Sequence, residues 1–359
     1  MSDIEKYRNK IDEIDEKMAE LFQERMEAVK GIAAYKKAGS LPVSDPLREE
    51  SVINRHLAEV REPWKKYYRD FMQNTFSISR SFQNEVIGYR EPLLKNGVSY
   101  SLFTDNAFIA SQKARADLKD NPETINATIG TLYGTDGVIM AFKSVYDVYD
   151  SIPARRKAGY SSLISGNPDY TDAVFSWINR LDNIRLAHRC IATPGGTGAI
   201  VLPIFNCLNP GETLIIPEIA WGSYKVMAAQ NGLSTETYEM FEDGQIAISG
   251  IMKKCREIMD RQKKVVIVIN DPCQNPTGIS LGKENWHKLI GYLNELSREG
   301  SIVIINDIAY LDYARDWHNA TDYMEEINAI TSDMAVIVAF SCSKSLTAYG
   351  MRLGAGIIL

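Results

Sequence analysis

The chain has 359 residues, of which 45% are apolar and 24% are charged, and its formal net charge is −6. This length exceeds one ordinary hydrophobic core and predicts two domains, while the composition excludes a disordered or fibrous protein. The mild acidity gives no electrostatic reason to expect a nucleic-acid partner. No apolar stretch reaches the roughly 18 residues of a membrane helix, so no membrane association is expected.

The sequence also favours a reducing compartment. Its first residues, MSDIEKYRNK, are charged from the start and lack the apolar centre of a signal peptide. The five cysteines are scattered without C-x-x-C spacing, which favours reduced thiols over a disulfide framework or a zinc site. The four histidines show no metal-ligand spacing, and we expect no metal. A cytoplasmic enzyme is the prediction.

Two compositional regimes predict a multidomain fold. Residues 1–90 are poor in glycine and carry helical periodicity, which predicts an all-α helical bundle. A charged segment with glycine and proline over residues 91–100 is suited to a linker. Over residues 101–359, short β-branched runs alternate with helical segments, as is typical of an α/β domain with a mostly parallel sheet.

Cations lie on the apolar face of the first helix. Apolar residues recur at steps of three and four over residues 4–37, which predicts a helix with one buried stripe, and a third helix is predicted over residues 64–87. Arg25 and Lys36 continue this stripe about 16 Å apart, and charges there are costly unless they are paired or meet a ligand. Arg8 lies about 25 Å before Arg25, so a functional Arg8 is expected to serve a second protomer.

Further polar residues follow on the second and third helices. Asp45 precedes a proline and predicts a helix N-cap, with Arg48 and Glu49 in the first turn. Ser79 and Gln83 share one face of the third helix. Together with the cations, they predict an anion pocket inside the bundle. Singly, these residues could be a helix cap, core-edge cations and an exposed polar pair.

The joint pattern resembles the all-helical chorismate mutases (type II) over nearly all of residues 4–88. The matching text is Tyr7-Arg8-x-x-Ile11-Asp12-x-x-Asp15, Glu24-Arg25-Met26, Lys36, Pro42-Val43-x-Asp45-x-x-Arg48-Glu49 and Ser79-x-x-x-Gln83. This resemblance implies rearrangement of chorismate to prephenate in two pockets shared by interlocked protomers. It implies that the substrate carboxylates contact Arg25, Arg48 and Ser79 of one protomer and Arg8 of its partner. It also implies that Asp45 and Glu49 contact the ring hydroxyl and that Lys36 and Gln83 contact the ether oxygen.

Three apolar runs in the larger domain end in polar residues. Residues 265–270, 302–307 and 335–341 predict strands buried on both faces of the sheet, and ligands of such sheets bind beyond the carboxyl ends of the strands. The text found there is Asn275-Pro276-Thr277-Gly278, then Asp307-x-x-Tyr310, then Ser341-x-x-Lys344 with Arg352 eight residues later. Each motif alone could be a turn, a strand cap or a solvated lysine.

Two segments earlier in the sequence are also expected at the carboxyl ends of the strands. The turn Gly195-Gly196-Thr197-Gly198 follows a short strand and opens an apolar helix, where backbone N–H groups suit a phosphate. Trp221 follows another predicted strand over residues 213–216.

The order and spacing of these motifs resemble the class I aminotransferases, which are fold-type-I enzymes of pyridoxal 5'-phosphate, over about residues 100–359. The resemblance implies that Lys344 binds the cofactor aldehyde and carries the substrate proton, and that Asp307 pairs with the pyridine nitrogen. It implies further contacts from Asn275 and Tyr310 at the phenolic oxygen, Gly196, Thr197, Ser341 and Arg352 at the phosphate, Trp221 on the ring, Tyr160 at a neighbouring subunit's phosphate, and Gly130 in the segment that closes over substrate.

The fusion predicts a bifunctional homodimer with shared active sites, acting on chorismate, amino acids and 2-oxo acids in phenylalanine and tyrosine synthesis. The aminotransferase substrates would be aromatic amino or keto acids, or prephenate. Family members continue beyond the position of Leu359 into a small domain that supplies an arginine for the substrate carboxylate. The resemblance therefore implies that this sequence lacks the small domain. One alternative is a mutase whose catalytically dead larger domain serves dimerisation or regulation, and another is a transaminase whose helical module only senses an aromatic metabolite.

Overall fold

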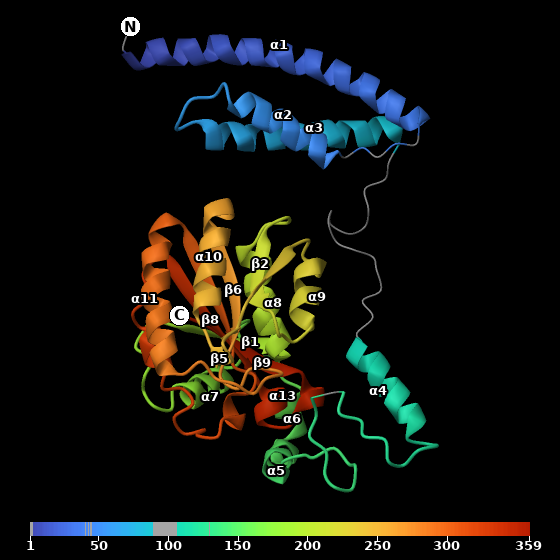
Figure 1. Ribbon diagram of the computed structural model, residues 1–359, viewed down its shortest axis with the longest axis vertical. Coiled ribbons are helices and arrows are strands. Elements are labelled where there is room, and N and C mark those ends of the chain that lie inside the picture. Colours follow the sequence, from blue (N-terminus) through green and yellow to red (C-terminus); the bar gives the residue numbers. More distant parts are fainter. Residues whose placement is uncertain (1–2, 40, 42, 44, 89–105, 129) are drawn as a thin grey trace. The chain divides into compact units, whose positions relative to one another are not determined.

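A computed structural model describes residues 3–39, 41, 43, 45–88, 106–128 and 130–359. The chain divides into two compact units, residues 1–95 and 96–359, and each is described by itself (Figure 1). The predicted linker over residues 91–100 and the motif residue Pro42 lie outside the described residues. Within those residues, no helix is both long and apolar enough to cross a membrane.

The described residues of the first unit form three helices, as the periodicity predicts. They are α1 (Asp3–Ala38), α2 (Pro46–Leu57) and α3 (Lys65–Ile87), and α3 contacts both of the others. The small core between them contains Val29 and Ala33 of α1, Ile53 of α2 and Met72 of α3. The second half of α1 therefore carries the buried residues of this helix.

The apolar stripe on the first half of α1 is exposed in the single chain, which corrects the prediction of one buried stripe. Ile11 is 55% and Leu21 62% exposed. The reason is length, because α1 has 36 residues and α3 has 23, which correspond to about 54 Å and about 34 Å of helix. The helix α3 cannot cover the first turns of α1 while it packs on the last ones.

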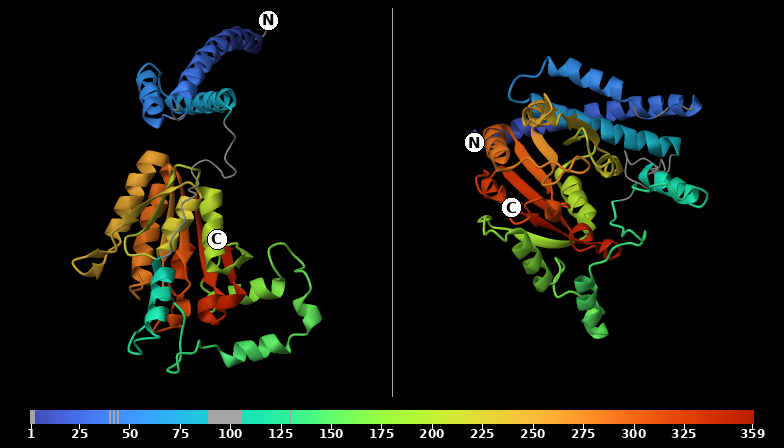
Figure 2. Two further views of the ribbon diagram at one scale, coloured as in Figure 1. Left: turned by 90° about the vertical axis from the view of Figure 1, so that its right-hand side faces the viewer. Right: turned by 60° about the horizontal axis from the view of Figure 1, so that its bottom comes forward.

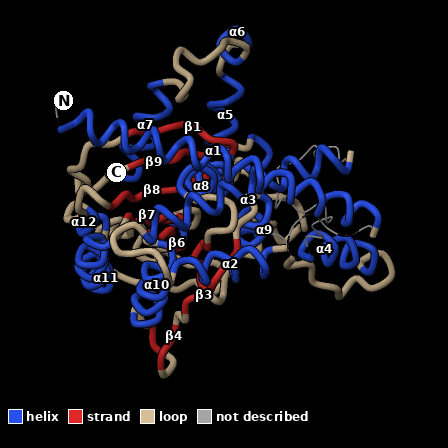
Figure 3. Tube along the Cα trace, turned by 90° about the horizontal axis from the view of Figure 1, so that it is seen from above, coloured by secondary structure: helices blue, strands red, loops and turns tan. Residues whose placement is uncertain are grey.

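The second unit is built on a seven-stranded sheet of order β1-β9-β8-β7-β6-β2-β3, which Figure 3 shows from above. All neighbours in it are parallel except β9, which is antiparallel to both β1 and β8. The strands are β1 (Arg189–Pro194), β2 (Thr213–Pro217), β3 (Ser234–Tyr238), β6 (Lys264–Asn270), β7 (Ser301–Asp307), β8 (Met334–Ser341) and β9 (Leu353–Ile358). The predicted mostly parallel sheet is confirmed, and β6, β7 and β8 match the three predicted runs.

Helices cover both faces of this sheet (Figure 2). Side chains alternate along each strand, so that Val265 and Ile267 of β6 face one core while Val266 and Val268 face the other. The first core is closed by α7 (Pro168–Ile178), α10 (Ser249–Gln262), α11 (Lys283–Leu296) and α12 (Met324–Ile327), and the second by α8 (Gly195–Cys207) and α9 (Ser223–Gln230). The remaining described elements are α4 (Asn106–Asp117), α5 (Lys143–Ser151), α6 (Ala154–Lys157), α13 (Cys342–Ser345), the short 3-10 turns and the hairpin β4 (Phe241–Glu242) and β5 (Gln245–Ile246).

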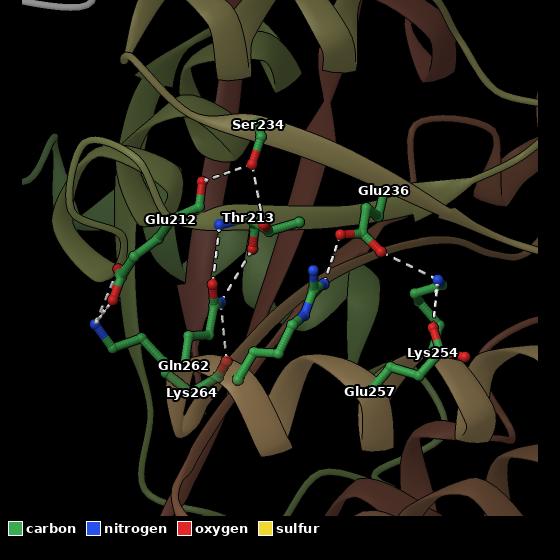
Figure 4. Close-up of polar contacts among 9 residues, drawn as sticks. Glu212, Thr213, Ser234, Glu236, Lys254, Glu257, Gln262 and Lys264 are labelled. Carbon is green, nitrogen blue, oxygen red and sulfur yellow. Dashed lines mark hydrogen bonds and ion pairs between the residues drawn. The ribbon is translucent and has the colours of Figure 1, made fainter. Parts of the chain in front are cut away.

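Polar side chains tie the amino ends of the strands together (Figure 4). The amide of Gln262 accepts a hydrogen bond from the Thr213 backbone N at 3.0 Å and donates to the Thr213 carbonyl at 3.2 Å and the Lys264 carbonyl at 3.0 Å. Beside it, Glu212 and Lys264 form an ion pair at 3.3 Å, and Glu236 pairs with both Lys254 and Arg261. The contacts of Gln262 and Glu212 hold β2 beside β6, and those of Glu236 hold β3 against α10.

Candidate functional site

A cavity of about 1020 Å³ lies at the carboxyl ends of β6, β7 and β8. That volume is at the upper end of the range for small-molecule sites, about 300–1,000 Å³. The sequence-predicted residues that line it are Gly130, Gly196, Thr197, Trp221, Asn275, Asp307, Tyr310, Ser341, Lys344 and Arg352. Tyr160 is fully exposed and is not among the lining residues.

Asp307, at the end of β7, is the buried acid of this cavity, with 4% of its surface exposed. Its Oδ2 accepts a hydrogen bond from the Tyr224 hydroxyl at 2.5 Å, and its Oδ1 accepts one from the Ala309 backbone N at 3.0 Å. Burial raises the pKa of the Asp307 carboxyl, while these hydrogen bonds and the positive charge of Lys344 oppose the rise. The carboxyl can therefore pair with a positively charged group inside the cavity.

Lys344 follows β8 and lies in α13. Its Nζ donates to the Gly130 carbonyl at 2.5 Å and lies 5.4 Å from the ring centroid of Tyr310 and 5.5 Å from that of Tyr349. Burial lowers the pKa of Lys344, and the nearby charge of Arg352 lowers it further against the opposing effect of Asp307. A lowered pKa increases the fraction of neutral amine, which is the nucleophilic form.

The first turn of α8 and Arg352 form an anion cradle. The helix begins at Gly195, so the N–H groups of its first turn have no partner within the helix. A Cβ atom on Gly195 would lie 2.8 Å from Nη2 of Arg352, and the φ of Gly195 is +74°. Arg352 is held in turn, because its Nη1 donates to the Ser343 hydroxyl and the Tyr349 carbonyl, both at 3.3 Å. N–H groups, a helix N-terminus and a guanidinium together suit a phosphate.

Asn270 and Tyr224 connect the lining residues to one another. The Asn270 side chain accepts from the Asn275 backbone N at 2.7 Å and donates to the Asp307 carbonyl at 2.8 Å. The ring of Tyr224 meets Trp221 edge to face, with centroids 5.5 Å apart. Sequence reasoning did not select either connecting residue for the site. The only available signal was that Asn270 ends an apolar run.

A segment from before α5 is fastened over Lys344. Besides the Gly130 carbonyl, the Leu132 backbone N donates to the Tyr349 hydroxyl at 3.2 Å, and the Phe142 backbone N donates to the Thr347 hydroxyl at 2.9 Å. A Cβ on Gly130 would lie 3.0 Å from Nζ of Lys344. Only a residue without a side chain fits this approach without displacement.

In the first unit, Arg25, Ser79 and Gln83 come together between α1 and α3. The guanidinium of Arg25 donates to the Ser79 hydroxyl, and Nε2 of Gln83 donates to the Ser79 carbonyl at 3.3 Å. Ser79 and Gln83 are buried, and within the described residues Oε1 of Gln83 has no hydrogen-bond partner. Burial lowers the pKa of Arg25. The half-buried Arg25 and the buried Ser79 and Gln83 thus form a polar cluster able to meet a ligand.

The remaining predicted residues of this unit lie around α2 and at the two ends of α1. Asp45 caps α2 by accepting from the Arg48 backbone N at 3.1 Å, and Lys36 donates to the Val43 carbonyl at 2.6 Å. Glu49 forms an ion pair with Arg80, which sequence reasoning missed. Arg8 is exposed and lies 17 positions before Arg25 on the same continuous helix, so one chain does not bring these two arginines together.

Comparison with known proteins finds a family match in each of the two units. Residues 141–358 match the family model of aminotransferase class I and II, and residues 7–84 match that of chorismate mutase type II. An aspartate aminotransferase of Pseudomonas aeruginosa is 26% identical over 246 residues, which cover 65% of this chain and 58% of that protein. An aromatic-amino-acid aminotransferase of the same organism is 26% identical over 175 residues, covering 46% and 40%.

Solved aminotransferase structures have a fold similar to that of the second unit. The crystal structure of an aminotransferase from Anaerococcus prevotii has a TM-score of 0.71 and 33% identity, covering 75% of this chain and 66% of that chain. An aromatic-amino-acid aminotransferase from Burkholderia pseudomallei, covalently bound to pyridoxal phosphate, has a TM-score of 0.58 and 22% identity, covering 74% and 66%. The chain thus spans 58% of the length of the first curated relative and about two thirds of these structures.

The cradle predicts unequal effects of two glycine substitutions on β9. A Cβ on Gly354 would lie 2.4 Å from the Gly195 carbonyl carbon, whereas a Cβ on Gly356 would make only ordinary contacts of 3.6 Å or more. We expect Gly354→Ala to lower the free energy of unfolding by about 2 kcal/mol or more. The matched control Gly356→Ala is expected to change it by less than about 0.5 kcal/mol. Chemical denaturation measures both, and equal effects would contradict the close approach of β9 to the cradle.

Proposed function

The chain belongs to the class I and II aminotransferases, and from this premise we propose that it is a bifunctional enzyme. In this proposal residues 101–359 are a pyridoxal-phosphate-dependent aminotransferase and residues 1–90 a chorismate mutase. The observation that carries the first half is one cavity that contains a buried acid, a lysine of lowered pKa and an anion cradle. The polar cluster of Arg25, Ser79 and Gln83 carries the second half.

The residues of the cavity fit pyridoxal phosphate. Gly195 leaves the room beside Arg352 that a side chain would fill, which suits a phosphate at the start of α8. Trp221 offers an aromatic face among the lining residues, and Asp307 offers a carboxylate for the protonated ring nitrogen. Lys344 offers the amine for the aldehyde. Each polar group of the cofactor therefore has a counterpart of suitable chemistry.

When bound, pyridoxal phosphate supplies an electron-withdrawing ring that stabilises negative charge on the substrate α-carbon. In this proposal Asp307 keeps the ring nitrogen protonated, because a buried carboxylate favours a positive partner. Lys344 would hold the cofactor covalently and would carry the substrate α-proton on its Nζ. Asn275 and Tyr310 would donate to the phenolic oxygen. The segment of Gly130 limits the access of water to Nζ.

Covalent capture tests the cofactor site. Incubation with pyridoxal phosphate followed by borohydride reduction is expected to leave the cofactor mass on the peptide that contains Lys344, read by mass spectrometry. Lys344→Ala is expected to abolish this mass, whereas Lys225→Ala, which removes an exposed lysine of α9, is expected to retain it. Equal labelling of the two variants would contradict the assignment of Lys344 as the residue that binds the cofactor.

The aminotransferase substrates are proposed to be aromatic amino acids and their 2-oxo acids, or prephenate. The support is the fusion to a mutase domain and the names of relatives such as the aromatic-amino-acid aminotransferase of Pseudomonas aeruginosa. Amino transfer from glutamate or aspartate to a panel of 2-oxo acids identifies the acceptor. A chain that carries the cofactor on Lys344 but transfers no amino group would favour the alternative of a catalytically dead domain.

The mutase half of the proposal needs no nucleophile or general base in the protein. Rearrangement of chorismate forms one carbon–carbon bond as one carbon–oxygen bond breaks within the same molecule. The site must hold a dicarboxylate in its reactive conformer and stabilise charge that grows on the ether oxygen. Arg25 and Arg48 are proposed at the carboxylates with Ser79, and Lys36 and Gln83 at the ether oxygen. Asp45 and Glu49 are proposed at the ring hydroxyl.

Removing the amide of Gln83 tests the mutase site. Gln83→Ala is expected to reduce the rate of chorismate consumption about 100-fold, because a single donor to developing charge typically contributes this much. Gln73→Ala, an exposed glutamine of the same helix, serves as the matched control and is expected to keep the wild-type rate. Chorismate absorbance measures both. Equal rates in the two variants would remove Gln83 from the site.

We propose that two copies of the chain pair through α1. The support is the exposed apolar stripe from Ile4 to Leu21, an extended surface that a soluble helix rarely leaves uncovered. Pairing through this stripe would also supply the partner's Arg8, because Arg8 lies on the uncovered half of the helix. The five cysteines are free, which supports the proposal of a cytoplasmic, reducing environment.

Mixing inactive variants tests a pocket shared by two copies. Arg8→Ala and Arg25→Ala are each expected to abolish mutase activity in both pockets of a dimer. After random exchange of protomers, half of the dimers are mixed and each has one intact pocket, so on the order of a quarter of the wild-type activity should return. A mixture of Arg25→Ala with Gln83→Ala is the control and should regain none. The absence of recovery in the first mixture would show that Arg8 does not serve a partner's pocket.

A further inference from the structure

We propose that Tyr224 is a positioning residue that fixes the Asp307 carboxylate in the orientation in which it meets the cofactor ring, an inference that rests on the proposed cofactor site. Tyr224 lies in the first turn of α9, three positions after Trp221, and its side chain is fully buried. Its hydroxyl donates to Oδ2 of Asp307 at 2.5 Å. The two residues are 83 positions apart in the sequence.

The backbone of Asp307 is held independently of Tyr224. Its carbonyl accepts from the Asn270 side chain at 2.8 Å and from the Asp271 backbone N at 3.1 Å, and the residue is paired with both neighbouring strands. Among the described residues, the Asp307 carboxylate has one further hydrogen-bond partner, the Ala309 backbone N, which donates to Oδ1. Without the Tyr224 hydroxyl, one hydrogen bond would remain, and the carboxylate could rotate while the strand stayed in place.

The ring of Tyr224 has a second, separable contact. It meets the Trp221 ring at 83°, edge to face, with 5.5 Å between centroids. Trp221 and Asp307 both line the cavity, and Tyr224 touches both. Because phenylalanine retains the ring, Tyr224→Phe removes only the contact with the carboxylate and leaves the aromatic contact with Trp221.

The Tyr224 hydroxyl also affects the pKa of Asp307. The titratable groups that act on Tyr224 are Asp307, Tyr238 and Tyr310, and those that act on Asp307 are Tyr224 and Lys344. Burial raises the pKa of Tyr224 well above its usual value, so the hydroxyl stays a donor. Its hydrogen bond lowers the pKa of Asp307, against the effect of burial. Loss of the hydroxyl should therefore move ionisation of Asp307 to higher pH.

The test compares Tyr224→Phe with Tyr238→Phe, another buried tyrosine whose hydroxyl donates to the Val268 carbonyl at 3.2 Å. Pyridoxal phosphate is titrated into each protein across a range of pH. We expect Tyr224→Phe to weaken binding about tenfold near neutral pH and to shift the pH profile upward, and Tyr238→Phe to leave both unchanged. Wild-type affinity and profile in Tyr224→Phe would overturn the proposal.

A second measurement decides the inference without the cofactor. The unfolding equilibrium constants of cofactor-free wild type, Tyr224→Phe, Asp307→Ala and the double variant form a double-mutant cycle. We expect the constant of the double variant to differ about tenfold from the value that independent effects of the two substitutions would give. Independent effects would overturn the positioning role. If wild-type protein fails to take up pyridoxal phosphate on Lys344, the proposed function falls, whereas this cycle still reports on Tyr224 and Asp307.

Discussion

The larger site depends on keeping one carboxylate, that of Asp307, inside the protein. A buried carboxylate costs free energy unless hydrogen bonds or charges satisfy it. Here a tyrosine hydroxyl, a backbone N–H and a lysine of opposite charge act on the same group. These partners come from α9, from the turn after β7 and from α13, which follows β8. The acid therefore requires the carboxyl ends of several strands and one helix to meet at one point.

The parallel sheet meets this requirement because its strands end at one edge. The register places Asn270 opposite Asp307 and Asp307 opposite Ala339, so β6, β7 and β8 deliver their following turns side by side. The antiparallel strand β9 completes the arrangement differently. Its Gly354 lies so close to the carbonyl groups of Gly195 and Phe340 that no side chain fits at this position. Close passage of β9 against the start of α8 keeps Arg352, just before the strand, at the cradle.

The sequence predicted the parts of this arrangement that have a local cause. Continuous apolar runs identified β6, β7 and β8, and the rule that ligands bind beyond strand ends selected Asp307 and Lys344. Tyr224 could not be selected, because its partner is 83 positions away and a tyrosine in a first helical turn carries no signal of its own. Periodicity found the apolar stripe of α1 correctly but could not tell what covers it. That depends on the unequal lengths of α1 and α3.

The two units thus differ in what a single chain can complete. In the larger unit, one chain brings acid, lysine and cradle into one cavity. In the first unit, the long helix α1 carries Arg8 away from Arg25, and the buried Oε1 of Gln83 has no partner among the described residues. An unsatisfied buried amide oxygen costs about 1–3 kcal/mol. A hydrogen-bond donor from a second copy of the chain would remove that cost. Pairing of two chains would therefore stabilise the small bundle.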